Sequence, residues 1–253
     1  MGGLVQLIEE RIWSGALTPG TRLPSERVLA LQYDVSRPVV REALRSLQER
    51  GVIEIRPSRG AFVRAAGSLD LAAHVGSFAR QRGATARDLI RVRAVLEEES
   101  ARLAAENADS AQAGHLADLV DAMDAARDVV ERARCDLAFH SLLARLSGNP
   151  VIEIMFGSIS ALVLEQIIRS VGDRSVAVEG EPLHRVVAEA VASGDGDKAA
   201  EAMRRHVLLA RELYGPDLDE PLENVARRTV QTIVGDATSL EEIVADVLSG
   251  LVR

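Results

Sequence analysis

Four residues in the second half of the chain combine one carboxylate with three imidazoles, which are donor groups for a transition-metal ion. Asp136 and His140 are four residues apart, so both side chains leave the same face of a helix. His184 and His206 lie in two later segments with helical patterns. If these helices pack antiparallel, the four side chains can meet and bind a divalent metal such as zinc, or nickel or manganese.

The alternative is that these histidines have only a structural role. A lone histidine on a helix is more often a buried or capping residue than a metal ligand. A bound metal could also have several roles. It could hold a small molecule for a regulator, be the signal of a metal sensor, stabilise the fold only, or activate water in a hydrolytic enzyme. We expect no enzyme, because no carboxylate besides Asp136 is suitably positioned as a general base.

The segments that carry these residues are predicted to be helical, like nearly all of the chain after residue 69. Glycines, prolines and polar clusters mark the breaks between helices, and Ser239 with Glu242 predicts a capping box for the last helix. The predicted helices span 69–82, 86–107, 110–129, 131–147, 150–171, 179–193, 196–214, 221–234 and 239–251. The fold class is therefore mainly α, with an all-α bundle in the C-terminal part.

The segment from Leu23 to Val63 predicts two short helices, a tight turn and a small β-hairpin. Ser25 can cap the first helix, and Asp34 can adopt the left-handed conformation of the turn. Ser36 can cap the second helix, which is expected to end at Gly51. The predicted strands span 52–55 and 61–64.

The second of these helices has an apolar face and a basic face. The apolar face repeats at spacings of three, four and seven and consists of Val40, Ala43, Leu44 and Leu47. The basic face consists of Arg37, Arg41 and Arg45. Arginines at this spacing are usually a solvated face, but the order helix, turn, helix and wing predicts a winged helix-turn-helix that binds DNA.

Three motifs within residues 4–64 carry a resemblance: Leu-Pro-Ser-Glu-Arg, Val-Ser-Arg-Pro-x-x-Arg-Glu-Ala-Leu and Arg-Gly-x-Phe-Val. They resemble the winged-helix domain of the GntR family of bacterial transcription regulators. We expect a homodimer whose two winged helices bind the two half-sites of a palindromic double-stranded operator. The DNA-binding residues expected are Arg27, Ser36, Arg37, Arg41, Arg59 and Gly60, with Arg37 and Arg41 contacting bases or phosphates.

Between residues 70 and 214, the segments Arg93 to Glu97, Asp136 to His140 and Ser147 to Asn149, together with His184 and His206, resemble the effector domain of the FadR subfamily, the FCD domain. The resemblance implies a metal held by Asp136, His140, His184 and His206, and a small organic acid as effector. Arg93 and Asn149 are the expected effector contacts. Two alternatives remain open: Arg93 pairs with Glu97 instead, and Asn149 only starts the next helix.

Composition agrees with two domains of opposite charge. Residues 1–66 contain ten Arg and seven Asp or Glu, a net charge of +3, while the remainder contains 20 basic and 31 acidic residues, −11. Only the positively charged first part is suited to binding the phosphates of DNA.

The single cysteine, Cys135, excludes an internal disulfide. We expect no membrane span, no signal peptide and a cytoplasmic location.

The sequence therefore predicts a DNA-binding transcription regulator, expected to be a repressor, whose operator binding responds to an organic acid bound beside a divalent metal. The predicted parts are a winged helix-turn-helix at 1–66, a linker at 67–69, an effector-binding and dimerisation domain at 70–214, and a helical extension at 215–253. The extension is expected to pack on the bundle or across a dimer. Neither the effector nor the operator sequence can be predicted.

Overall fold

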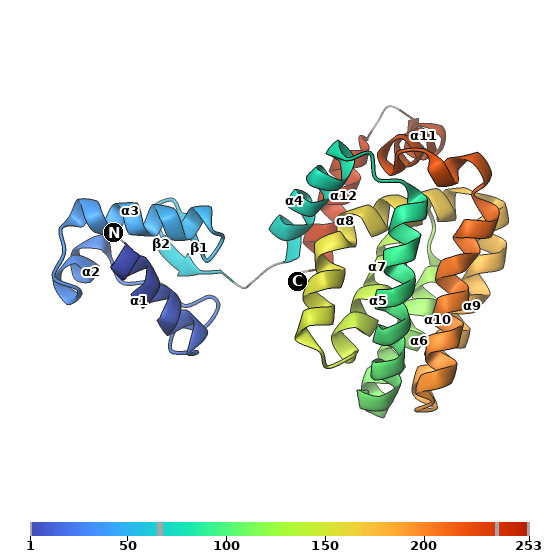
Figure 1. The fold of residues 1–253 in the computed structure, drawn as a ribbon, viewed down its shortest axis with the longest axis horizontal. Coiled ribbons are helices and arrows are strands. Elements are labelled where there is room, and N and C mark those ends of the chain that lie inside the picture. The colour runs from blue at the N-terminus through green and yellow to red at the C-terminus, as the bar shows by residue number, and fades with distance from the viewer. Residues whose placement is uncertain (1, 65–67, 236–237, 252–253) are drawn as a thin grey trace. The chain divides into compact units, whose positions relative to one another are not determined.

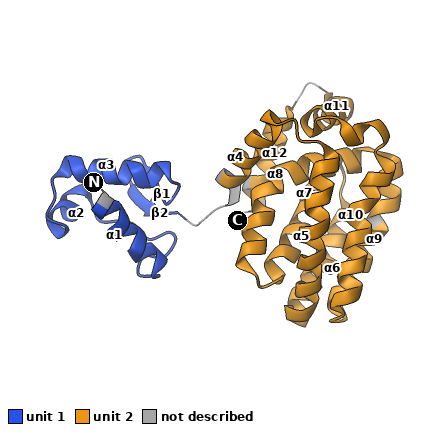
Figure 2. Ribbon diagram, viewed as in Figure 1, with its two compact units in different colours: residues 1–70 blue, residues 71–253 orange. Residues whose placement is uncertain are grey.

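The computed structural model of the chain describes residues 2–64, 68–235 and 238–251. It divides into two compact units, Met1–Asp70 and Leu71–Arg253 (Figure 2). The predicted linker at 67–69 begins outside the described residues. The structure is mainly helical, with one two-stranded sheet in the described residues, so the predicted fold class is confirmed.

The first unit is a helical domain with a short hairpin. Its elements are α1 (Gly2–Trp13), α2 (Glu26–Gln32), α3 (Arg37–Glu49), β1 (Ile53–Arg56) and β2 (Gly60–Val63). The strands pair antiparallel, with Ile53 opposite Val63, so each strand is shifted by one residue from its prediction. Its core combines all these elements and consists of Leu4, Val5, Ile8, Leu23, Leu29, Val40, Ala43, Leu44, Leu47, Ile53, Ala61 and Val63.

Local side chains explain the turn between α2 and α3. Ser25 accepts a hydrogen bond from the backbone N–H of Val28, as predicted. Asp34 has a φ of 50°, the left-handed conformation expected of it. Ser36 stands at the N-cap position of α3, but its side chain makes no capping hydrogen bond, so that part of the prediction is wrong.

The second unit is a bundle of long helices (Figure 1). Its elements are α4 (Ser68–Gln81), α5 (Ala86–Asn107), α6 (Ser110–Ala125), α7 (Val129–Leu146), α8 (Pro150–Gly172), α9 (Arg174–Ala192), α10 (Gly196–Leu213), the 3₁₀ turn η1 (Gly215–Asp219), α11 (Leu222–Val234) and α12 (Leu240–Leu251). Most bounds lie within two residues of the prediction. The largest differences are that α6 ends at Ala125 and α9 begins at Arg174, because Asp128 and Asp173 cap the following helices.

Helix α8 has the length and composition of a membrane span, although none is expected from the sequence. Its mean hydropathy is 1.8 over 18 residues. However, 72% of this stretch is buried inside the protein. The helix is apolar because it is packed on several sides, as the contacts with α7, α9, α11 and α12 indicate.

The C-terminal extension packs on its own bundle, which is one of the two arrangements expected. Helices α11 and α12 contact α8, and the Ser239–Glu242 capping box forms as predicted. Arg80 of α4 pairs both with the buried Glu165 of α8, at 2.8 Å, and with Glu223 of α11, at 3.6 Å. The extension is thus tied to the helix that begins the second unit.

Candidate metal centre

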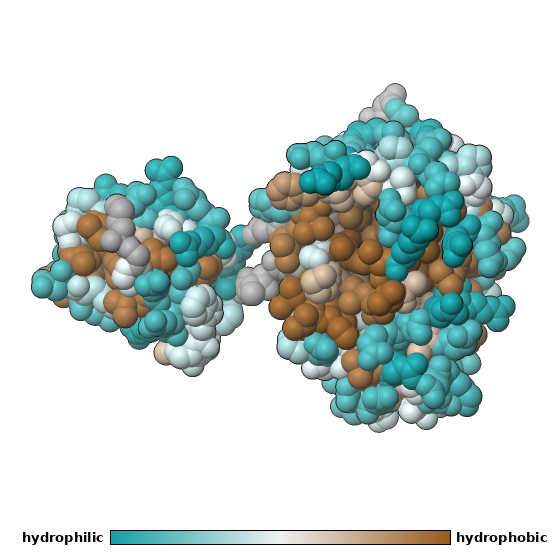
Figure 3. Space-filling model, in the orientation of Figure 1, coloured by the Kyte–Doolittle hydropathy of each residue, from teal (hydrophilic) through white to brown (hydrophobic). Residues whose placement is uncertain are grey.

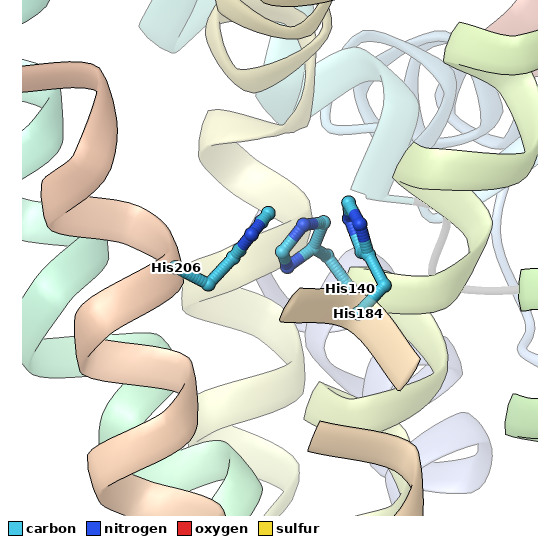
Figure 4. A group of neighbouring side chains, drawn as sticks. All are labelled: His140, His184 and His206. Carbon is cyan, nitrogen blue, oxygen red and sulfur yellow. The ribbon is translucent and has the colours of Figure 1, made fainter. Parts of the chain in front are cut away.

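Three imidazoles from three helices converge in the second unit (Figure 4). His140 comes from α7, His184 from α9 and His206 from α10. One ring nitrogen from each lies within 4.8 Å of those of the other two. His140 and His184 are buried, and His206 is partly exposed. The bundle therefore brings together histidines that are up to 66 residues apart in the sequence.

Asp136 adds the carboxylate that the spacing on α7 predicted. Its Oδ1 lies 3.2 Å from His140 Nε2, and its Oδ2 lies 3.5 Å from His184 Nε2. Phe139, fully buried beside them, makes edge contacts with the rings of both histidines, at 5.7 and 5.2 Å between centroids. The phenyl ring restricts how either imidazole can turn.

Several polar atoms of this cluster are buried without a hydrogen bond. They are Asp136 Oδ1, His140 Nδ1, His184 Nε2 and His206 Nδ1. Some lie at ion-pair distance from a neighbour, but none has hydrogen-bond geometry. Unsatisfied polar groups are costly in a protein interior. One carboxylate and three imidazoles match the donors that a divalent transition metal requires, and each has a buried atom without a hydrogen bond. His140 also lies 3.5 Å from Arg93 Nη2 through its Nε2.

Glu97 of α5 is a second carboxylate at the cluster, and sequence reasoning missed this role. Its Oε2 lies 2.5 Å from His140 Nδ1, while its Oε1 accepts a hydrogen bond from Arg93 Nε at 2.5 Å. The sequence suggested only the pair with Arg93. Histidines that bind metals commonly present their second nitrogen to a carboxylate, which fixes the ring, and Glu97 has this position relative to His140.

Burial and neighbouring charges shift the pKa values of the cluster. Burial raises the pKa of Asp136, but His184 and His140 outweigh this and hold it well below its ordinary value. Burial lowers the pKa of His140, but Glu97 and Asp136 outweigh burial and raise it. Burial and the two other histidines lower the pKa of His206 well below its usual range. Asp136 is thus ionised and His206 neutral near pH 7, the forms that bind metals.

A cavity adjoins the cluster and is lined by Asp136, His184 and His206 among others. Arg93 also lines it and is nearly fully buried. Its guanidinium is held by Glu97 and by Gln166 Oε1, at 3.1 Å from Nη1. The pairing with Glu97 and the position at the cavity, which the sequence presents as alternatives, therefore occur together.

Asn149 is not among the residues that line this cavity. It is exposed, and its side chain accepts hydrogen bonds from the backbone N–H groups of Val151 and Ile152 at the start of α8. The second interpretation of this residue, a helix cap before Pro150, agrees with the structure. The geometry gives no support to a role in effector binding.

The residues expected to contact DNA lie on the surface of the first unit. Arg27, Ser36, Arg37, Arg41 and Arg59 are all exposed, and Gly60 is half-buried. Arg41 lies 3.4 Å from Glu26, with 70% of its side chain exposed. Gly60 has a φ of 105°, which an L side chain rarely adopts, so the tip of the wing requires glycine.

Both units match known protein families. Residues 2–63 match the family described as "Bacterial regulatory proteins, gntR family", and residues 88–209 match the family described as "FCD domain". A solved structure, Streptococcus agalactiae GntR, has the same fold, with a TM-score of 0.66 and 24% identity over 83% of this chain and 97% of that one.

The chain is also similar to three curated proteins. The HTH-type transcriptional regulator LutR of Bacillus subtilis (strain 168) is 29% identical over 84% of this chain and 100% of LutR. The HTH-type transcriptional repressor NanR of Salmonella newport (strain SL254) is 30% identical over 79% of each chain. The Glc operon transcriptional activator of Escherichia coli (strain K12) is 33% identical over 67% of this chain and 69% of the activator. These relatives are transcription regulators, not enzymes.

Proposed function

Because this chain belongs to the GntR family of bacterial regulators, with an FCD domain as its second unit, we propose that an organic acid controls its binding to DNA. The chain is a transcription regulator whose helix-turn-helix domain binds DNA. In the proposal the acid binds in the cavity beside Arg93, at a metal held by Asp136, His140, His184 and His206. The regulator acts on DNA in the cytoplasm, as a repressor.

One observation carries the metal part of this proposal: a carboxylate and three imidazoles converge, and Asp136 Oδ1, His184 Nε2 and His206 Nδ1 are buried there without hydrogen bonds. Asp136 and the three histidines would hold the ion, and Glu97 would orient His140 through Nδ1. A divalent ion bound there would supply positive charge and open coordination positions to the oxygens of an acid. Zinc suits this donor set, and nickel or manganese are the alternatives.

Arg93 provides a route from the acid to the rest of the domain. A carboxylate in the cavity would compete with Glu97 and Gln166 for its guanidinium, because all three are acceptors. The backbone carbonyl of Gln166 in turn accepts a hydrogen bond from the hydroxyl of the buried Tyr214, at 3.0 Å. A change at Arg93 would therefore reach α8 and the end of α10, which supports coupling between effector and fold.

A homodimer fits the operator symmetry that this family of DNA-binding domains implies. Figure 3 shows apolar residues gathered on the face of the second unit that carries α5 and α8. The large apolar side chains exposed on these two helices are Val92, Val95, Val151, Ile154 and Met155. Exposed apolar patches commonly mark protein interfaces, so we propose this face as the dimer contact. The contacts with DNA are proposed for Arg27, Ser36, Arg37, Arg41, Arg59 and Gly60.

The metal proposal is tested by elemental analysis of the purified protein and of single variants. We expect about one zinc, nickel or manganese ion per chain, lost in His140→Ala and His206→Ala but kept in His115→Ala. His115 is exposed on α6, so its variant controls for loss of any histidine. No metal after incubation with excess zinc would refute the proposal.

The regulatory proposal is tested by gel shifts of operator DNA with the metal-loaded protein. An organic acid should change the affinity for DNA at constant metal. If the affinity instead follows the zinc concentration and no acid has an effect, the protein is a metal sensor. If chelation lowers only the melting temperature and leaves DNA binding unchanged, the metal is structural.

A further inference from the structure

The cavity beside the metal centre has a polar end at the cluster, and the rest of its wall is mostly apolar, apart from Asp124 and Arg132. The polar end consists of the cluster itself with Arg93, Gln166 and Ser170. The apolar wall draws on α6, α8, α9 and α10 and includes Val120, Met123, Ile167, Val176, Val207 and Leu209. A ligand whose acid group faces the cluster must therefore place its other atoms against hydrocarbon, where hydroxyl groups would find few partners.

Charge at the cavity argues against a second carboxylate on the ligand. Arg132 and Asp124 both line the cavity and have opposite charges. Asp124 is held by Arg185, at 2.9 Å, and Arg132 has an interaction of its own within the protein. Asp124 has the charge that repels an acid group, and Arg132 is already engaged within the protein, so neither is a free cation for a second carboxylate.

The size of the cavity limits the apolar part of the ligand. Its volume is about 60 Å³, and one water needs roughly 10–15 Å³, so the cavity has room for several groups of the size of water or methyl. A short branched body fits this volume.

We propose that the effector is a monocarboxylic acid with a compact apolar body of a few carbons, such as a branched 2-hydroxy or 2-oxo acid. Sugar acids and dicarboxylic acids are disfavoured. This inference rests on the proposed function, because it assumes that an acid binds at the metal centre. It adds that the apolar wall, and not only the metal, selects among acids that share one head group.

Gly180 of α9 offers a way to change the wall without disturbing the fold. It lines the cavity, and a Cβ added there would lie 3.7 Å from Leu209 Cδ2, an ordinary contact. Alanine is also a better helix former than glycine. Gly180→Ala should therefore fold normally and fill about one methyl of the space. Gly114→Ala is a matched control, because Gly114 lies on α6 with nothing within 4 Å of its added Cβ.

The first experiment is calorimetric titration of zinc-loaded protein with three acids that share one head group: 2-hydroxypropanoate, 2-hydroxy-4-methylpentanoate and 2-hydroxybutanedioate. Each buried methylene strengthens binding by about fourfold, so the branched acid should bind at least about tenfold more tightly than 2-hydroxypropanoate. Equal or tighter binding of the dicarboxylic acid, or of gluconate, would overturn the inference and leave the proposed function intact. No binding of any acid to protein that contains zinc would refute both.

The second experiment repeats the titration with the two glycine variants. Gly180→Ala should weaken binding of the branched acid by about tenfold and leave the zinc content and the affinity for 2-hydroxypropanoate unchanged. Gly114→Ala should behave like the natural protein in all three measurements. If Gly180→Ala leaves the affinity for the branched acid unchanged, its apolar body does not lie against this wall and the inference is wrong.

Discussion

Replacing Glu97 by glutamine removes one negative charge from the middle of the second unit while keeping the shape of the side chain. Arg93 and Glu97 form an ion pair whose side chains are only 5% and 2% exposed. Burial raises the pKa of Glu97, but Arg93 and His140 outweigh this and hold it well below its ordinary value, so the carboxylate is ionised at neutral pH. In the variant the guanidinium of Arg93 stays buried without the carboxylate of its ion pair.

The expected loss is large. Removing one partner of a buried ion pair costs about 3–5 kcal/mol. Since glutamine can still accept one hydrogen bond from Arg93, we expect the lower end, about 3 kcal/mol. For a domain of this size that corresponds to a fall in melting temperature of roughly 6–12 °C. Zinc affinity should fall by about 10- to 100-fold as well, because His140 loses the carboxylate beside Nδ1.

The assay is thermal unfolding of metal-free protein, followed by zinc titration of the folded protein in competition with a chelator. Glu99→Gln is the matched control on the same helix, because Glu99 is 52% exposed and lies 3.6 Å from Arg102. Its loss should cost less than about 0.5 kcal/mol. If Glu97→Gln melts like Glu99→Gln, the energetic argument is refuted. If it melts early but binds zinc normally, Glu97 supports Arg93 and does not orient His140.

Two further predictions concern the DNA-binding surface and the dependence of stability on pH. Arg37→Ala should weaken specific DNA binding by about 1–3 kcal/mol if the side chain reads a base. Unchanged operator affinity in a gel-shift titration would show that Arg37 does not contact a base. Burial outweighs the nearby guanidinium of Arg80 and raises the pKa of Glu165 to about 7 from 4.5. Because the pKa of Glu165 is higher in the folded state, the protonated side chain stabilises the fold relative to the ionised one. This stabilisation is complete below about pH 4.5 and is lost as the pH rises through about 7. Relative to the natural protein, Glu165→Gln should therefore gain stability between pH 5 and 8, by at most about 3 kcal/mol, and a pH-independent difference would contradict this.

The parts of the fold that follow from local sequence could be predicted well. The cap at Ser25, the left-handed Asp34 and the apolar face of α3 depend on residues within a few positions of one another. The four-residue spacing of Asp136 and His140 is local in the same way. The predicted end of α6 and start of α9 are wrong, because Asp128 caps α7 and Asp173 caps α9.

The parts that depend on packing between helices could not be predicted. The contact between Glu97 and His140 joins residues on α5 and α7, and no local spacing indicates it. By sequence alone helix α8 resembles a membrane span, and only its packing in the bundle shows that this apolar stretch is mostly buried inside the protein. The apolar wall of the cavity is similarly made by four helices. Asn149, in contrast, has a role that follows from local sequence, because its side chain caps the start of α8 and needs no ligand.

Glu97 also has a consequence for how this protein and its relatives can change over evolution. One carboxylate holds both Arg93, at the cavity, and His140, in the metal centre. A substitution of Glu97 would disturb both sites at once. A substitution of Arg93 or His140 would likewise leave Glu97 without one of its two partners. We expect the three positions to covary among related sequences, and lineages that abandon the metal should lose the glutamate together with the histidine.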